Sequence, residues 1–111
     1  MGDRDFLGEF ELFTLLTVHR LGDDAYGMRI RQELEVQADR STSIGALYST
    51  LDRLEQKGLL ESSLGEATAE RGGRAKKYFR LNPAGRDALR KSLAAMQRLA
   101  TGELAKLLEA L

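Results

Sequence analysis

Apolar residues recur at helical spacing in two segments near the start of the chain. A stripe that contains Phe10 and Phe13 predicts a first helix over residues 6–21. Apolar positions spaced by four predict a second helix over residues 25–38, with Asp24 as its N-cap. A polar, glycine-containing stretch separates the two stripes, so we expect two helices joined by a turn.

A third segment has the most complete helical pattern. Ser43 is a good N-cap, and Gly58 is a typical helix terminator. Between them, one apolar stripe is formed by Ile44, Leu47, Leu51 and Leu54. The opposite, polar side of this helix is therefore expected to face solvent or a partner.

The spacing of apolar residues then changes to a period of two. Residues 59–64 and 77–81 predict strands, and the polar, glycine-bearing segment 65–73 predicts the loop between them. The two strands are expected to pair as a hairpin.

Asn82 and Pro83 predict the start of a long last helix, because asparagine caps well and proline suits the first helical position. The apolar seam of this helix runs through Leu89, Leu93, Met96, Ala100, Leu104, Leu107 and Leu111. Gly102 lies within the seam and is a point where it can bend.

This seam is longer than three short helices and a hairpin can cover. We therefore expect part of it to pack on a second copy of the chain. The residues expected there from the first helix are Phe6, Phe10 and Phe13. Packing of the seam on the chain's own first helix alone is the alternative.

The order of these elements predicts a mainly α (α+β) fold. It is that of a winged helix-turn-helix with a two-stranded wing and a long C-terminal dimerisation helix. With 111 residues the chain is expected to form one compact unit. Within it, residues 1–82 would be the winged-helix part and residues 83–111 the dimerisation helix.

The composition excludes several kinds of site. With no Cys and one His, the chain has no disulfide, no thiol nucleophile and no pair of histidines for a metal. No motif supplies His19 with the partners of a catalytic triad, so we expect no enzyme and no metal or cofactor. No stretch reaches the roughly 18 apolar residues of a membrane helix, and no signal sequence is recognised, so a cytoplasmic protein is expected.

The net charge of zero is unevenly distributed. Residues 1–39 contain 4 bases and 9 acids, residues 40–80 contain 8 and 5, and residues 81–111 contain 5 and 3. Residues 71–80 contain five bases and no acid. Such a basic stripe can bind a polyanion even on a neutral protein, because phosphate contacts act over about one Debye length.

Double-stranded DNA is the expected partner of the polar side of the third helix and of the basic loop. Small residues at the helix start allow close approach to the DNA backbone, while hydroxyl groups, that of Thr50 included, can contact phosphates or bases. The candidate residues on the helix are Ser43, Gly45, Ala46, Tyr48, Ser49 and Arg53. Those on the wing are Arg71, Gly72, Gly73, Arg74, Lys76 and Lys77. The alternative is a protein-contact module whose working surface is the acidic first third.

Six segments carry a family resemblance. They are LGEFEL at 7–12, DAYGMRI at 24–30, SIGALY at 43–48, LDRLEQKGL at 51–59, ERGGRAKKYF at 70–79 and NPAG at 82–85. In sequence and order they resemble the PadR-like transcriptional regulators, which are bacterial winged-helix repressors. The resemblance implies a DNA-reading helix that includes Ser43, Gly45, Tyr48 and Arg53, a wing at 71–77, and dimerisation through the first and last helices. It predicts a homodimeric repressor that occludes a palindromic operator.

Some relatives in this family sense a small molecule in or near the dimer interface. Here the aromatic residues of the first helix, together with Met96 and Leu99, are the candidates for lining such a cavity. Nothing polar converges on them, so we interpret them as interface core and keep a small-molecule effector as the alternative.

Overall fold

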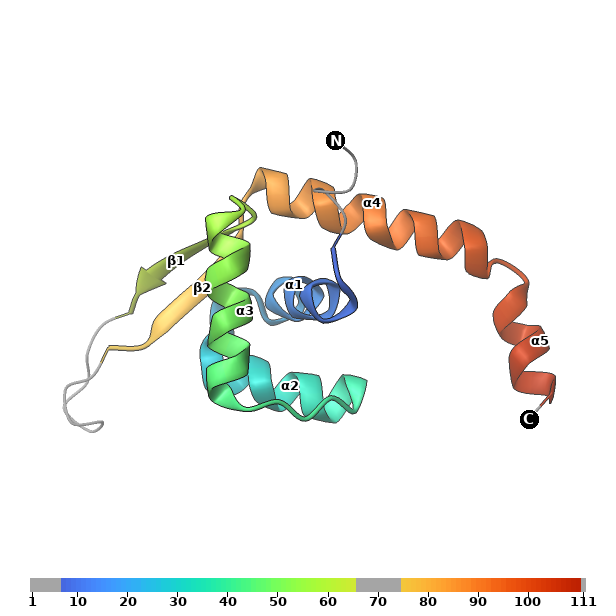
Figure 1. Cartoon of the computed structure of the whole chain (residues 1–111), viewed down its shortest axis with the longest axis horizontal. Helices are drawn as coiled ribbons and strands as arrows, with labels where there is room; N and C mark the ends of the chain where they lie inside the picture. The colour runs from blue at the N-terminus through green and yellow to red at the C-terminus, as the bar shows by residue number, and fades with distance from the viewer. Residues whose placement is uncertain (1–6, 66–74, 111) are drawn as a thin grey trace.

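The computed structural model describes residues 7–65 and 75–110 of the chain. It is mainly helical with one two-stranded antiparallel sheet, which confirms the predicted fold class (Figure 1). The elements are α1 (Glu9–Leu21), the short 3₁₀ helix η2 (Gly22–Asp24), α2 (Gly27–Ala38), α3 (Ile44–Gln56), β1 (Leu60–Leu64), β2 (Lys77–Leu81), α4 (Pro83–Ala100) and α5 (Glu103–Ala110).

One hydrophobic core holds the winged-helix part together. Helix α1 lies at its centre and contacts α2, α3, α4 and β2 (Figure 1). Side chains from each of these elements are almost fully buried: Leu15, Val18, Ile30, Leu34, Leu47, Leu51, Leu54, Phe79 and Leu89. The core therefore fixes α3 and the wing relative to each other, which is the arrangement that a DNA-binding face requires.

The predicted caps of α3 and α4 are confirmed. The Oγ atom of Ser43 accepts a hydrogen bond of 3.0 Å from the backbone N–H of Ala46. The Oδ1 atom of Asn82 accepts one of 2.8 Å from the backbone N–H of Gly85, and proline is at the start of α4. Each cap satisfies a backbone donor that the helix itself leaves without a partner.

The predicted N-cap of α2 is wrong. Asp24 belongs to η2, and α2 begins at Gly27 after the extended residue Tyr26, whose side chain makes no capping hydrogen bond. The cause is a contact distant in sequence, because the backbone N–H of Phe79 donates to the carbonyl of Ala25 at 2.8 Å. Ala25 and Tyr26 are thereby held against β2 in non-helical conformations, and the helix starts after them.

The hairpin follows the predicted pairing. Strands β1 and β2 are antiparallel, with Leu60 opposite Leu81 and Leu64 opposite Lys77. An isolated bridge joins Tyr26 to Tyr78 on the other side of β2. The wing strand β2 is thus attached both to β1 and to the segment before α2.

The predicted single helix over 83–111 is divided in two. Helix α4 ends at Ala100, Thr101 leaves the helical region with ψ 120°, and Gly102 has φ +80°. Glycine adopts this left-handed conformation without the steric cost that a side chain adds, so the chain turns here and α5 runs in a different direction (Figure 1). The apolar seam therefore does not continue straight beyond Ala100.

Within the described ranges, none of the helices combines the length and apolar character needed to cross a membrane.

Candidate nucleic-acid interface

Helix α3 presents a row of small and polar side chains to solvent. Gly45, Ser49, Asp52 and Gln56 are spaced by four and three residues and are all exposed, as are Ser43 and Ala46 near the helix start. The opposite side of α3 carries the buried residues Leu47, Leu51 and Leu54. The predicted division of this helix into a buried and an exposed side is therefore confirmed.

Two residues of α3 differ in burial from what the sequence predicts. Thr50 is only 4% exposed, so its hydroxyl is not available to a phosphate or base. Ile44, which the apolar stripe places on the buried side, lies at the start of the helix and is exposed.

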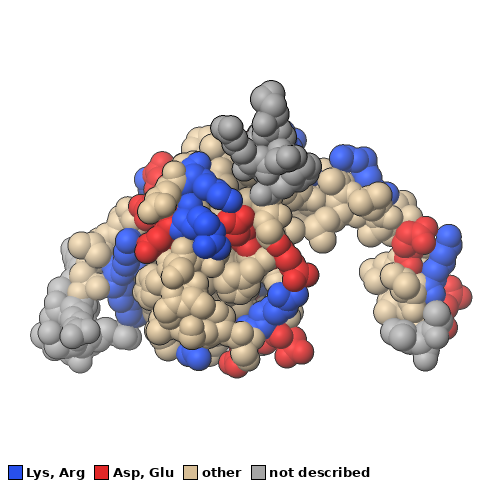
Figure 2. Space-filling model, viewed as in Figure 1, with Lys and Arg blue, Asp and Glu red and all other residues tan. Residues whose placement is uncertain are grey.

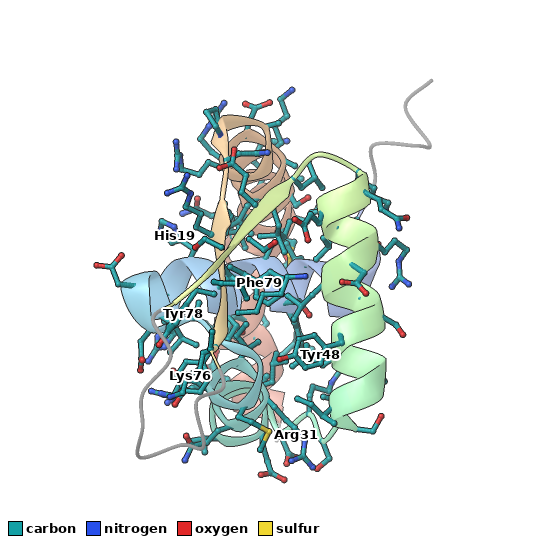
Figure 3. All side chains as sticks on the ribbon, turned by 90° about the vertical axis from the view of Figure 1, so that its left-hand side faces the viewer. His19, Arg31, Tyr48, Lys76, Tyr78 and Phe79 are labelled. Atoms are coloured by element: carbon teal, nitrogen blue, oxygen red, sulfur yellow. The ribbon has the colours of Figure 1, made fainter. Side chains whose placement is uncertain are left out.

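Tyr48 lies on the side of α3 that faces the wing. Its ring packs against Phe79 of β2 with 6.4 Å between ring centroids. Its phenol end closely covers Gly27, where an added Cβ atom would lie 2.7 Å from Cζ of Tyr48. Figure 3 shows Tyr48 and Phe79 between α3 and the strands. Tyr48 thus couples the position of α3 to those of α2 and the wing.

Arg53 does not extend freely from α3. Its Nε atom donates to Oε2 of Glu11 on α1 at 3.0 Å, and its Nη2 atom donates to the hydroxyl of Thr50 at 3.3 Å. Lys57 binds the same carboxylate, with its Nζ atom 2.9 Å and 3.1 Å from the two oxygens. To contact a phosphate or guanine, Arg53 would therefore have to leave its ion pair with Glu11 on α1.

Glu11 is a buried acid that holds these two cations. It is 7% exposed and also accepts a hydrogen bond of 3.1 Å from the backbone N–H of Gly8. Burial acts to raise the pKa of Glu11, but the hydrogen bonds from Lys57, Arg53 and Gly8 outweigh it and place the pKa below its ordinary value. Glu11 is therefore ionised at neutral pH.

In the described part of the wing, one lysine packs on an aromatic ring and the other lies near an acidic side chain. The Nζ atom of Lys76 lies 3.9 Å from the ring centroid of Tyr26, and that ring meets Tyr78 edge to face at 5.6 Å. The Nζ atom of Lys77 lies 4.0 Å from Oε1 of Glu55. The other expected wing residues lie outside the described residues: Arg71, Gly72, Gly73 and Arg74.

Arg31 is a candidate that the sequence analysis missed. Its Nε atom donates to the backbone carbonyl of Thr42 at 2.7 Å, and within the described residues it forms no ion pair. Figure 3 shows Arg31 and Lys76 on the same side of the molecule as Tyr48. The available signal was its place on the polar side of the second helix, because the first helix of a helix-turn-helix crosses the DNA backbone.

The residues expected at a dimer interface divide into two groups. Leu89 is buried in the chain's own core, and Phe10, Phe13 and Leu93 pack against that core. Most of the remaining described apolar side chains of α4 and α5 are exposed: Met96, Leu99, Ala100, Leu104, Leu107 and Leu108. Phe6 and Leu111 lie outside the described residues. The first half of the seam thus serves the fold, and the second half remains uncovered.

A shallow groove runs between α1 and α4 next to the buried half of the seam. Apolar side chains line its floor, and His19, Arg86, Arg90 and Gln97 lie at its rim. Neither this groove nor any other part of the described ranges contains a cluster of three or more metal-binding side chains.

Charged side chains are distributed over the face seen in Figure 2 as mixed basic and acidic groups, with basic groups on the side of the wing. This agrees with the ion pairs of the described residues, most of which join neighbouring helices or successive turns of one helix.

Comparison with known proteins relates this chain to a family. The model of the Transcriptional regulator PadR-like family matches residues 15–91. Transcriptional regulator Rv3488 of Mycobacterium tuberculosis is 39% identical over 82 residues, which cover 74% of this chain and 72% of that protein. A PadR-like transcription factor from Bacteroides fragilis has a similar structure, with a TM-score of 0.72, 29% identity and coverage of 91% of this chain and 90% of that one. The complex structure of hsRosR-S4 is also similar, with a TM-score of 0.64, 30% identity and coverage of 83% and 72%.

Proposed function

Because this chain belongs to the PadR-like family of transcriptional regulators, which are not enzymes and whose function implies DNA binding, we propose that it is a homodimeric repressor of a palindromic operator. The observation that carries the proposal is the exposed row of small and polar side chains on α3. Binding of this face to the operator would exclude the polymerase.

The row on α3 fits the major groove. A helix that enters this groove needs small side chains where it approaches the backbone, and Gly45 and Ala46 are exposed at its first turn. Ser49 and Gln56 follow on the same side and carry groups that can donate and accept hydrogen bonds at base edges. These residues would therefore supply readout, while the cations beside them would supply phosphate contacts.

Dimerisation is supported by helix α5. An isolated helix of 8 residues is marginal in water, and every described side chain of α5 is exposed. Its Leu104, Leu107 and Leu108 are 61%, 64% and 61% exposed, which is a large apolar surface for one short helix. A second copy that covers α5 and the end of α4 would remove this surface from water and stabilise the helix.

A two-fold dimer would present two α3 helices to successive half-sites of the operator. The palindrome in the proposed operator follows from this symmetry, because each half-site would meet the same protein surface.

The DNA-binding proposal is tested by mobility shift across a salt series. The probes are a duplex from upstream of the protein's own gene and a random duplex of equal length. We expect both to bind at low salt and Arg31→Ala with Lys76→Ala to flatten the dependence of log K on log salt by about 3 to 4 units, for two lost phosphate contacts in each of two subunits. Lys91→Ala is the matched control, because Lys91 pairs with Asp87 on the outer side of α4. An unchanged slope in the double variant would remove Arg31 and Lys76 from the interface.

The dimer is tested separately by sedimentation equilibrium. We expect the wild type to sediment as a dimer and Leu104→Glu with Leu107→Glu to sediment as a folded monomer, because burying the new carboxylates in an apolar interface is unfavourable. A wild-type monomer at the concentrations used for DNA binding would contradict the proposal.

A further inference from the structure

The cations of α3 are held away from its exposed row. The row itself contains Gly45, Ser49, Asp52 and Gln56, with no Lys or Arg among them. The two bases of this helix segment, Arg53 and Lys57, lie on the flank of the helix that faces the start of α1. The exposed row of α3 therefore has no cation at its centre.

Glu11 is the group that holds both bases. Its two oxygens accept three hydrogen bonds from Arg53 and Lys57 at 2.9 Å to 3.1 Å. The side chain of Glu11 is 10% exposed, whereas that of Arg53 is 52% exposed and that of Lys57 is 35% exposed. The carboxylate of Glu11 is therefore on a buried side chain and is also bound by the backbone of Gly8, while the two cations that it holds are accessible to solvent.

We propose that Glu11 is a positioning residue for DNA specificity, which retains Arg53 and Lys57 on α1 so that α3 is read mainly through its small and neutral side chains. This inference rests on the proposed DNA-binding function. Free Arg53 and Lys57 would bind any phosphate backbone, because contacts to phosphate do not depend on base sequence. By neutralising them, Glu11 lowers the affinity for random DNA.

The test is Glu11→Gln, which keeps the size of the side chain and removes its charge. The measured quantity is the affinity for a random duplex as a function of salt. Two additional phosphate contacts in each subunit of the dimer, from Arg53 and Lys57, add about 3 to 4 units to the salt slope. This is about a hundredfold larger loss of affinity when the salt rises about fourfold. We expect Glu11→Gln to show this steeper slope and tighter binding of random DNA at low salt.

Two further variants separate positioning from a merely structural role. Adding Arg53→Ala and Lys57→Ala to Glu11→Gln removes all three charges and is expected to return the slope to the wild-type value. Glu33→Gln is the matched control, because Glu33 is 8% exposed and holds Arg20 and Arg29 between α1 and α2 rather than on α3. It is expected to lower folding stability without steepening the slope.

The outcomes are distinct. A folded Glu11→Gln protein with the wild-type slope, or an equal steepening in Glu33→Gln, would overturn the inference. Wild-type protein that binds neither duplex at low salt would instead refute the proposed function. Circular dichroism of each variant in the binding buffer establishes that it is folded.

Discussion

The contact between Gly85 and Leu59 is a tight backbone approach that a substitution can probe. Gly85 lies in the first turn of α4 and is buried. A Cβ atom added there would overlap the carbonyl oxygen of Leu59 and lie 3.0 Å from its carbonyl carbon. Both obstacles are backbone atoms, so a change of side-chain rotamer cannot relieve them. In Gly85→Ala the start of α4 must move away from the segment before β1.

The cost can be worked from the groups that this movement separates. The backbone N–H of Asn82 donates to Leu59 at 3.3 Å, and the Nδ2 atom of Asn82 donates to Gly58 at 2.7 Å. Each hydrogen bond is worth about 1 kcal/mol net, and overpacking costs about 1 to 3 kcal/mol. Alanine in place of glycine returns about 1 kcal/mol of helix propensity. We expect Gly85→Ala to lower the free energy of unfolding by about 2 to 4 kcal/mol.

Gly45→Ala is the matched comparison. Gly45 is also helical, but it is exposed and an added Cβ atom would have no neighbour within 4 Å. Here only the propensity changes, so we expect stabilisation of up to about 1 kcal/mol. Because Gly45 lies on the proposed DNA-facing row, the same methyl group is expected to weaken DNA binding.

Urea unfolding followed by far-ultraviolet circular dichroism measures both variants. The protein concentration must be equal throughout, because self-association makes the apparent stability depend on it. If Gly85→Ala unfolds at the same urea concentration as Gly45→Ala, α4 does not approach Leu59 this closely, and the reasoning fails.

Three further predictions concern single groups. Asn82→Ala is expected to cost about 1 to 2 kcal/mol in urea unfolding, since it removes the cap of α4, and Asn82→Asp, which keeps the accepting oxygen, should lose less. Gly58→Ala is expected to cost about 1 kcal/mol in the same assay, because φ is +79° there while the space around it is open; a neutral effect would contradict this. The pKa of Glu11 is lower in the folded protein than its ordinary value of 4.5. Ionised Glu11 therefore stabilises the fold above pH 4.5, and this stability is lost as the pH falls through the folded-state pKa. In acid unfolding, Glu11→Gln should therefore lose less stability than wild type below pH 4.5.

The sequence was sufficient for most of the fold because its strongest signals are local. The caps Ser43 and Asn82 and the terminator Gly58 act on backbone groups within a few residues. The change from helical to alternating spacing identified the strands for the same reason. Such features do not depend on how distant segments meet.

The errors came from contacts between distant segments and from one ambiguous glycine. Asp24 is a reasonable N-cap in isolation, but pairing of Ala25 with Phe79, far along the chain, moves the start of α2. Gly102 fits equally well in a bent helix and at a break, and only its φ value distinguishes them. Local spacing carries no information on either point.

The candidate site was less predictable than the fold. The exposed side of α3 follows from helical periodicity, but the ion pair of Arg53 with Glu11 joins residues 42 positions apart. Arg31 was missed because its suitability as a DNA contact depends on the orientation of α2 relative to α3. The sequence pattern of a single helix does not contain this orientation. Whether a side chain is free to bind a ligand therefore depends on tertiary contacts. The side of the helix on which it lies, in contrast, follows from the sequence.

The acidic first third also acquires a different meaning once its partners are known. Glu9 binds Arg40, Glu11 binds Arg53 of α3 and Lys57 directly after it, and Glu33 binds two arginines. These acids therefore hold helices together more than they form a surface for a basic partner, which weakens the alternative of a protein-contact module. The same pairing explains how a chain with zero net charge can bind a polyanion. Glu33 and Glu9 neutralise Arg20, Arg29 and Arg40, and Glu11 neutralises the bases beside α3. Among the described residues, Arg31 and Lys76 form no ion pair.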